Sequence, residues 1–262
     1  MSEKMIQTKL YSEYLKKQRY TLSKHMRKLE KQSDLSYSFA FIRSSVFSSM
    51  LEGSSIDLNN YLFNKENQYI DSNMQQIDDL VKAYKFAKNH VLNLKNVLKA
   101  HEILSSNFNM SNDYKGKLRT KDVYIKTWYG KTVYEGCPSD QVEKELENLF
   151  LEIDSLRNKK VSINKAFYYA AYIHLLFVNI HPFADGNGRL SRLLEKWVLV
   201  SLLKNDDCWK IPSEINYWIK REEYHLNLNQ LGKKYNELDY ENSLPFLLML
   251  PTSFGISKKF VK

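Results

Sequence analysis

The residues best suited to chemistry lie close together in residues 181–192, which read HPFADGNGRLSR. His181 has an ordinary pKa of about 6.5, so its imidazole can act as a general base near neutral pH. Asp185 supplies a carboxylate, and proteins typically hold Mg²⁺ through one or two carboxylates together with substrate phosphates. Arg189 and Arg192 are three residues apart, so they lie on one face of a helix. The stretch therefore predicts proton transfer beside a bound anion.

The position of the two arginines is the most informative feature of this stretch. A helix is predicted to begin there, and its first turn carries unpaired N–H groups and the positive end of the helix dipole. Cations oppose that dipole, so Arg189 and Arg192 are expected there mainly if an anion lies between them. Gly186 and Gly188 let a ligand approach the backbone N–H groups closely. Two guanidinium groups and backbone amides suit the phosphates of an Mg-nucleotide, with one phosphorus attacked by a hydroxyl that His181 deprotonates.

Two apolar helices are predicted to position these residues. Residues 166–180 contain no Asp, Glu, Lys or Arg, and apolar residues occupy every face at helical spacing, which is typical of a buried helix. Pro182 ends that helix because proline has no N–H to donate and disfavours helical geometry at the preceding residue. Residues 185–188 have the composition of a turn, and residues 189–203 form a second apolar helix. His181 is therefore expected at the fixed end of a rigid element.

Residues 181–192 match the signature HPFx[DE]GNGRxxR of the Fic (Fido) family at every specified position. Ala170, His174 and Phe177 resemble the residues that precede this signature, and the resemblance covers about residues 94–251. Family members with an unbroken signature are mostly adenylyltransferases, which move AMP from ATP to a Ser, Thr or Tyr hydroxyl of a protein. The resemblance implies an all-α bundle with a small β-hairpin flap, with ATP as substrate and Mg²⁺ as cofactor.

The resemblance also implies a role for each residue of the signature. These roles are His181 as the base, Asp185 on Mg²⁺, Gly186, Asn187 and Gly188 as the phosphate cradle, Arg189 and Arg192 on the β- and γ-phosphates, and Phe183 packed inward to aim the loop. Tyr224 resembles a family tyrosine close to the nucleotide. His101 also resembles a family histidine, and it is expected to be a core residue.

A second match to the family lies near the N-terminus, on a largely apolar helix predicted over about residues 35–53. Ser48, Glu52 and Gly53 fit the pattern S/TxxxE[GN], which many Fic proteins carry on an inhibitory helix. A glutamate followed by glycine also ends many ordinary helices, which is the alternative interpretation. The resemblance leads to the hypothesis that Glu52 pairs with Arg192 in the place of the γ-phosphate and inhibits transfer.

The third predicted element is a hairpin over about residues 121–135, where β-forming residues flank Trp128, Tyr129 and Gly130. It takes the place of the family's flap, and Gly116 to Arg119 resemble the GxxR approach to it. A hairpin edge can accept an extended segment by strand addition, which would hold a target hydroxyl near His181. An ordinary hairpin without a docking role is the alternative.

The composition favours a mostly helical protein, since 262 residues include only 8 Gly and 5 Pro and 43% are hydrophobic. The net charge of +9 comes from scattered lysines, so a basic solvated surface is expected rather than a nucleic-acid site. The two cysteines have no metal-like spacing and fit a reducing cytosol. Without a signal peptide or a membrane-length apolar run, the chain is expected to be cytoplasmic.

The prediction as a whole is a helical extension over residues 1–72, with one charged helix over residues 5–31, followed by a Fic core over residues 73–262. The predicted activity is transfer of AMP from Mg-ATP to a protein target docked on the flap, or to the chain itself. Three alternatives remain open: transfer of another phosphate-containing group, removal of AMP, and a non-enzymatic regulatory or interaction role. A kinase is excluded because GxxxxGK[ST], GxGxxG and an HRD/DFG pair are absent from the sequence.

Overall fold

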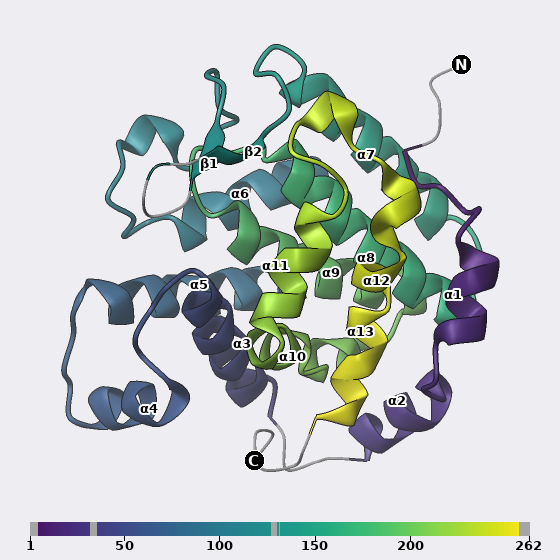
Figure 1. Cartoon of the computed structure of the whole chain (residues 1–262). Helices are drawn as coiled ribbons and strands as arrows, with labels where there is room; N and C mark the ends of the chain where they lie inside the picture. Colours follow the sequence, from purple (N-terminus) through teal and green to yellow (C-terminus); the bar gives the residue numbers. More distant parts are fainter. Residues whose placement is uncertain (1–4, 32–35, 127–129, 131, 257–262) are drawn as a thin grey trace.

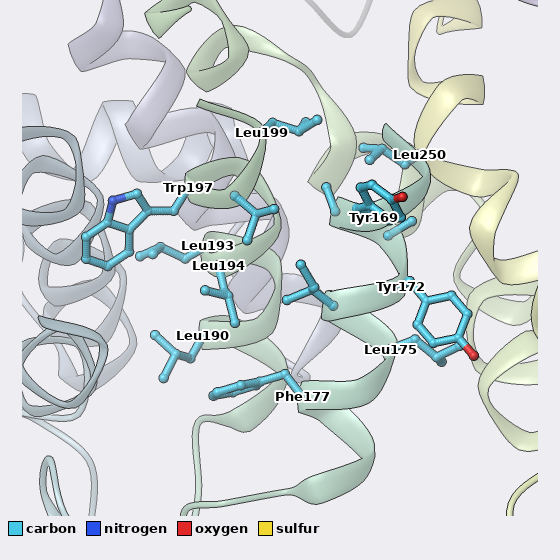
Figure 2. Close-up of a cluster of buried hydrophobic side chains, with 14 of the residues drawn as sticks. Tyr169, Tyr172, Leu175, Phe177, Leu190, Leu193, Leu194, Trp197, Leu199 and Leu250 are labelled. Atoms are coloured by element: carbon cyan, nitrogen blue, oxygen red, sulfur yellow. The ribbon is translucent and has the colours of Figure 1, made fainter. Parts of the chain in front are cut away.

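The centre of the fold is a helical hairpin made by α8 (Ile163–Ile180) and α9 (Asn187–Leu203), seen in the computed structural model of Figure 1, which describes residues 5–31, 36–126, 130 and 132–256. Helix α8 begins where the Ser162 hydroxyl accepts from the backbone N–H of Lys165 at 3.4 Å. From Ala166 onward nearly every residue of α8 is buried, as the absence of charge predicts. Figure 2 shows buried apolar side chains of both helices, which include Trp197 and Tyr172 on their outer sides.

Further helices surround this hairpin (Figure 1). They are α5 (Ser72–Asn89), α6 (Leu94–Leu104), α7 (Val142–Arg157), α10 (Ser213–Ile219), α11 (Arg221–Asn229), α12 (Leu244–Leu247) and α13 (Met249–Thr252). Short 3₁₀ turns lie at Asn112–Tyr114, Asp206–Lys210, Tyr235–Glu237, Tyr240–Ser243 and Ser253–Gly255. The predicted all-α class with a small hairpin is confirmed.

The predicted apolar helix near the N-terminus is α3 (Tyr37–Leu51), which begins where the Ser36 side chain accepts from Phe39 N–H at 3.1 Å. It packs between α5 and α10 and also contacts α9 (Figure 1). Most of its residues from Ala40 to Ser49 are buried, including polar ones, so α3 is a core helix rather than a surface helix. Helix α4 (Leu58–Glu66) follows and packs with α3 and α5 around a second, smaller apolar cluster.

The prediction of one charged helix over residues 5–31 is wrong, because the described part contains two short helices, α1 (Tyr11–Lys17) and α2 (Leu22–Glu30). The chain becomes extended at Gln18, whose side-chain amide donates to the carbonyl of Tyr20 at 2.7 Å. That local bond competes with the helical pattern and ends α1. Both helices join the main core through Tyr14, Leu22 and other apolar residues, and the boundary at residue 72 stays a prediction.

The predicted hairpin is present as β1 (Tyr124–Lys126) and β2 (Thr132–Glu135), an antiparallel pair. Tyr124 is opposite Glu135, and the register is irregular between Ile125 and Lys126. Trp128 and Tyr129 of the predicted turn lie outside the described residues. Within the ranges described, no helix combines the length and hydrophobicity needed to cross a membrane.

Candidate active site

His181 follows α8 directly and has left-handed backbone angles, with φ 53° and ψ 58°. Pro182 explains why the helix stops there, since it disfavours helical geometry at the residue before it. The ring nitrogen Nδ1 lies 3.2 Å from the carbonyl of Val178 and must donate to it, which leaves Nε2 with the lone pair. Burial lowers the pKa of His181, so the imidazole is neutral at pH 7 and can accept a proton at Nε2.

The loop after His181 is held by its own side chains. Asn187 is buried, and its amide both accepts from Phe183 N–H at 2.9 Å and donates to Phe183 O at 2.8 Å. The Asn187 side chain is therefore used within the loop, and its expected contact with a nucleotide rests on its backbone N–H. Phe183 is buried, as its expected inward position requires, and stacks on His101 with ring centroids 3.7 Å apart.

His101 is a buried residue, as expected for the core, but it also binds the loop. Its Nδ1 accepts from Gly116 N–H at 2.9 Å, so the proton sits on Nε2, which donates to Asp185 O at 2.9 Å. Burial lowers the pKa of His101 to about 4, which keeps the neutral form that makes both bonds. Gly186 has φ 82°, and a Cβ there would lie 3.4 Å from His101 Nε2 and still closer to Phe108 and Leu104, so glycine suits this turn.

The first turn of α9 presents backbone N–H groups together with Arg189. The Arg189 side chain is 9% exposed, donates to Gln76 Oε1 at 3.1 Å, and lies 4.0 Å from the ring centroid of Phe108. Its buried Nε has no hydrogen-bond partner among the described residues. Gln76 and Phe108 thus fix this cation from two distant segments, and its Nη2 lies 3.8 Å from Asp185 Oδ1.

Arg192 lies one turn further along α9 and is almost fully buried. It donates through Nε to Ser48 Oγ at 2.8 Å and through Nη2 to Ser48 O at 3.1 Å and Glu52 Oε1 at 2.6 Å. Its Nη1 is 3.4 Å from the hydroxyl of Tyr224. The pairing of Glu52 with Arg192 that the sequence suggested is therefore present.

Glu52 is the C-cap residue of α3, and its side chain is 33% exposed. The carboxylate is also pressed against Gly188, where an added Cβ would overlap it. Burial alone would raise the pKa of Glu52, but the charges of Arg192 and Arg189 outweigh burial and lower it. Glu52 thus occupies the anion position predicted at the start of α9.

A buried chain of hydrogen bonds supports Arg192 from behind. Arginine only donates, so Tyr224 must accept from Arg192 and pass its own O–H to His174 Nε2 at 3.1 Å. The Nδ1–H of His174 then donates to Glu195 Oε2 at 2.8 Å, which also accepts from Tyr217 at 2.7 Å. Tyr224, which the sequence associated with the nucleotide, is therefore a buried contact of Arg192.

Asp185 has a side chain that is 60% exposed and accepts from Gly186 N–H at 2.6 Å. The described residues contain no cluster of three or more His, Cys, Asp or Glu that could hold a metal ion by themselves. One open carboxylate beside an anion site fits Mg²⁺ brought in with phosphates, because Mg²⁺ keeps several non-protein ligands.

A cavity of about 260 Å³ lies between the flap, the end of α8 and α11. Its lining includes Ile125 and Val133 of the hairpin, Val178 of α8, and His225 and Leu228 of α11. The walls are mainly apolar, in contrast to the charged site at the start of α9.

A family model described as the Fic/DOC family matches residues 91–199. A Fido domain-containing protein of Dictyostelium discoideum is 28% identical over 146 residues, covering 56% of this chain and 91% of that protein. A protein adenylyltransferase Fic of Aedes aegypti is 32% identical over 151 residues, covering 57% of this chain but only 26% of that protein. The crystal structure of a Fic family protein from Desulfovibrio desulfuricans has a TM-score of 0.73 at 18% identity, covering 97% of this chain and 74% of that chain.

Proposed function

The chain belongs to the Fic/DOC family, whose domain spans residues 91–199, and from that premise we propose that it transfers AMP from Mg-ATP to a protein hydroxyl group. Members of the family are commonly transferases. The observation that carries the proposal is the place of Glu52, whose carboxylate lies on Arg192 and against Gly188 at the start of α9. A site that holds a carboxylate beside two arginines and a helix N-terminus suits the phosphates of a nucleotide.

In the proposed reaction, Nε2 of His181 takes the proton of the target hydroxyl group. The oxygen of that hydroxyl group bonds to the α-phosphorus of ATP at the same time. The bond from that phosphorus to the β-phosphate oxygen breaks, and pyrophosphate leaves. Arg189, Arg192 and the N–H groups of α9 stabilise the charge that develops on the leaving group. Asp185 would hold Mg²⁺, which supplies further charge neutralisation on the phosphates.

The apolar cavity beside Val178 supports a place for the adenine ring, since it lies between the last turn of α8, which precedes His181, and the flap. The hairpin above it is the proposed docking strand for the target. Glu135 N–H donates to Lys233 O at 2.8 Å, so the outer edge of β2 is already paired with the backbone of another segment at this residue. This leaves β1, in the described part of the chain, as the strand with an edge open to a target segment.

Glu52 gives the proposal its regulatory part. The carboxylate and the terminal phosphate of ATP compete for Arg192, so ATP binds poorly or with its α-phosphate turned away while Glu52 stays in place. Phosphoryl transfer depends on alignment of the attacking oxygen with the leaving group, so such a misplacement inhibits it. Glu52→Gly removes the competitor at the last cap of α3 and leaves the buried part of that helix intact.

The test uses the Glu52→Gly variant with Mg²⁺ and ATP labelled at either the α- or the γ-phosphate, with and without a cell lysate. We expect the α-label and not the γ-label on protein, at a rate well above that of the unaltered chain. Mass spectrometry of the labelled peptide identifies the modified hydroxyl, on a target or on the chain itself.

Two controls decide the chemistry. Glu52→Gly combined with His181→Ala should lose about 10²- to 10⁴-fold in rate, since only the base is missing. Transfer of the γ-label, or unchanged labelling in the double variant, would contradict AMP transfer with His181 as base.

A further inference from the structure

The carbonyl groups at the end of α8 have partners outside the helix. The last carbonyls of a helix lack intrahelical donors, so something else must satisfy them. Here four consecutive carbonyls, of residues 179–182, accept from the approach to the flap and from the flap itself. The bonds are Tyr134 Oη to Asn179 O at 2.7 Å, Arg119 Nη2 to Ile180 O at 3.2 Å, Arg119 Nε to His181 O at 2.7 Å, and Arg119 N to Pro182 O at 3.0 Å.

Arg119 also binds both ends of the flap. Its Nη1 donates to Lys121 O at 2.9 Å, before β1, and its Nη2 donates to Cys137 O, after β2. Gly136 suits this close packing, because a Cβ there would lie only 2.9 Å from Val123 Cγ2 and 3.3 Å from Arg119 Nη2. Arg119 is 3% exposed, and its guanidinium group therefore connects the chain before β1 and the chain after β2 to the backbone of His181.

The backbone of His181 needs such a connection. Left-handed backbone geometry is disfavoured for a residue with a side chain, and such a residue keeps it only where its surroundings fix it. Pro182 excludes the helical alternative, but it does not select among the remaining geometries. The bonds from Arg119 to the carbonyls on both sides of the His181–Pro182 peptide do select one.

We propose that Arg119 is a positioning residue that couples the flap to His181. The proposal rests on the proposed function in so far as His181 is the base. A target segment that pairs with the flap would hold the hairpin, and through Arg119 it would hold the imidazole in line with the hydroxyl it brings. The planar fork of arginine suits this task, since lysine cannot donate to four carbonyls at fixed angles.

The test compares three variants in the Glu52→Gly background by kcat, by the Kd of Mg-ATP and by melting temperature. Arg119→Met should lower kcat by about 10²-fold and Arg119→Lys by about tenfold, since small misplacements of a reacting group have effects of this size. Tyr134→Phe, which removes one carbonyl bond and keeps the ring, should lower kcat by about 3- to 10-fold. The Kd should change less than threefold in all of them, because Arg119 lies outside the anion site.

A second measurement separates the position of His181 from its charge. Burial lowers the pKa of His181, the Val178 carbonyl raises it, the charge of Arg119 lowers it further, and Glu52 and Asp185 raise it. Arg119→Met should therefore raise the pKa of His181 and move the acid limb of the pH–rate profile to higher pH. Arg119→Lys keeps the charge, so it should lower kcat without moving that limb. An NMR titration of the His181 ring, assigned by its loss in His181→Ala, follows the same change without any activity.

The matched control is Arg157→Lys, another arginine that donates to a backbone carbonyl, Leu92 O at 2.7 Å, but on α7 away from the site. It should leave kcat and the His181 titration unchanged. If the parent shows no transfer dependent on His181, the proposed function fails and the NMR titration still decides the coupling. Three results would overturn the proposal: an unmoved His181 titration in Arg119→Met, kcat within twofold of the parent in Arg119→Lys, or a rise in Kd and a fall in melting temperature that parallel the loss of kcat.

Discussion

Two of the ion pairs made by α9 lie one turn apart, and both face α3. Each consists of a cation of α9 with a carboxylate, and in each the cation also donates to the hydroxyl group of a serine of α3. The two sets are Arg192 with Glu52 at 2.6 Å and Ser48, and Lys196 with Glu214 at 2.7 Å and Ser44. Both the cations and the serines are four residues apart, so the two helices contact through a repeated arrangement.

The two pairs differ in their access to water. Lys196 and Glu214 are both completely buried, and Glu214 also accepts from Ser44 at 3.0 Å and from Tyr84 at 2.6 Å. Glu52 is one-third exposed and is the last cap of its helix. An external anion can therefore replace Glu52, but nothing can reach Glu214. The Lys196–Glu214 pair is therefore a structural contact that stays closed, whereas the Arg192–Glu52 pair, one turn away, can be exchanged for an external anion.

The largest effect is expected from Lys196→Met, which leaves Glu214 charged and buried without its cation. Breaking one side of a buried pair typically costs about 3–5 kcal/mol, so the free energy of unfolding in urea should fall by that amount. The double variant Lys196→Met with Glu214→Met should recover much of the loss, since two apolar groups need no partner. A loss below about 1 kcal/mol in the single variant would remove the distinction between the two pairs.

The exchangeable end of α9 is tested by comparing three neighbours. Charged hydrogen bonds are worth about 1.5–3 kcal/mol, so Arg189→Ala and Asp185→Ala should each lower kcat/KM for Mg-ATP by about 10- to 150-fold. Ser191→Ala is the control, because Ser191 donates to Gly188 O at 2.9 Å within the helix. Equal kcat/KM values in the three variants would show that the anion site lies elsewhere.

A smaller effect is expected on nucleotide affinity when the competitor is weakened. Glu52→Gly should lower the Kd of Mg-ATP by about 5- to 150-fold, corresponding to about 1–3 kcal/mol. Glu52→Gln keeps the shape and an acceptor for Arg192 but loses the charge, so its Kd should lie between those of the unaltered chain and Glu52→Gly. Calorimetric titration measures the Kd of all three proteins. Three equal values would show that residues 48–53 are only the end of a helix and do not compete with ATP.

The sequence predicted the α8–α9 corner well because its causes are local. A run without charges specifies a buried helix, Pro182 ends it, and Asp-Gly-Asn-Gly turns the chain. Likewise α3 could be predicted from its apolar composition and the hairpin from its β-forming residues. These features depend on neighbours within a few positions.

The support of the site could not be predicted, because it comes from distant segments. Gln76 and Phe108 hold Arg189, and neither has a recognisable pattern around it. His101 and Arg119 were noted as family-like positions, but the carbonyls that they bind become neighbours only after packing. The break at Gln18 was missed for a related reason, since a single side-chain bond outweighs a weak helical pattern.

The smallest expected effect is a difference between the Glu52–Arg192 and Glu214–Lys196 pairs in how the free energy of unfolding depends on pH. The folded protein lowers the pKa of both Glu52 and Glu214 from an ordinary 4.5, because nearby cations outweigh burial. A carboxylate with a lowered pKa adds stability above its unfolded pKa and loses that contribution as pH falls through the folded pKa. The Glu52 pair is partly exposed, so its contribution is about 1 kcal/mol or less.

Glu52→Gln is neutral at every pH, so the difference in unfolding free energy between it and the unaltered chain isolates this contribution. The difference should be constant from pH 7 to about 5. It should shrink below about pH 4.5, where Glu52 of the unfolded chain takes up a proton before Glu52 of the folded chain does. Glu214→Gln should give a larger difference with the same sign, since its pair is shielded from water. Urea titrations at a series of pH values measure both curves. A flat curve for Glu52→Gln down to pH 3 would mean that Arg192 does not hold Glu52 as an anion, and the carboxylate could then not act as the competitor of a phosphate.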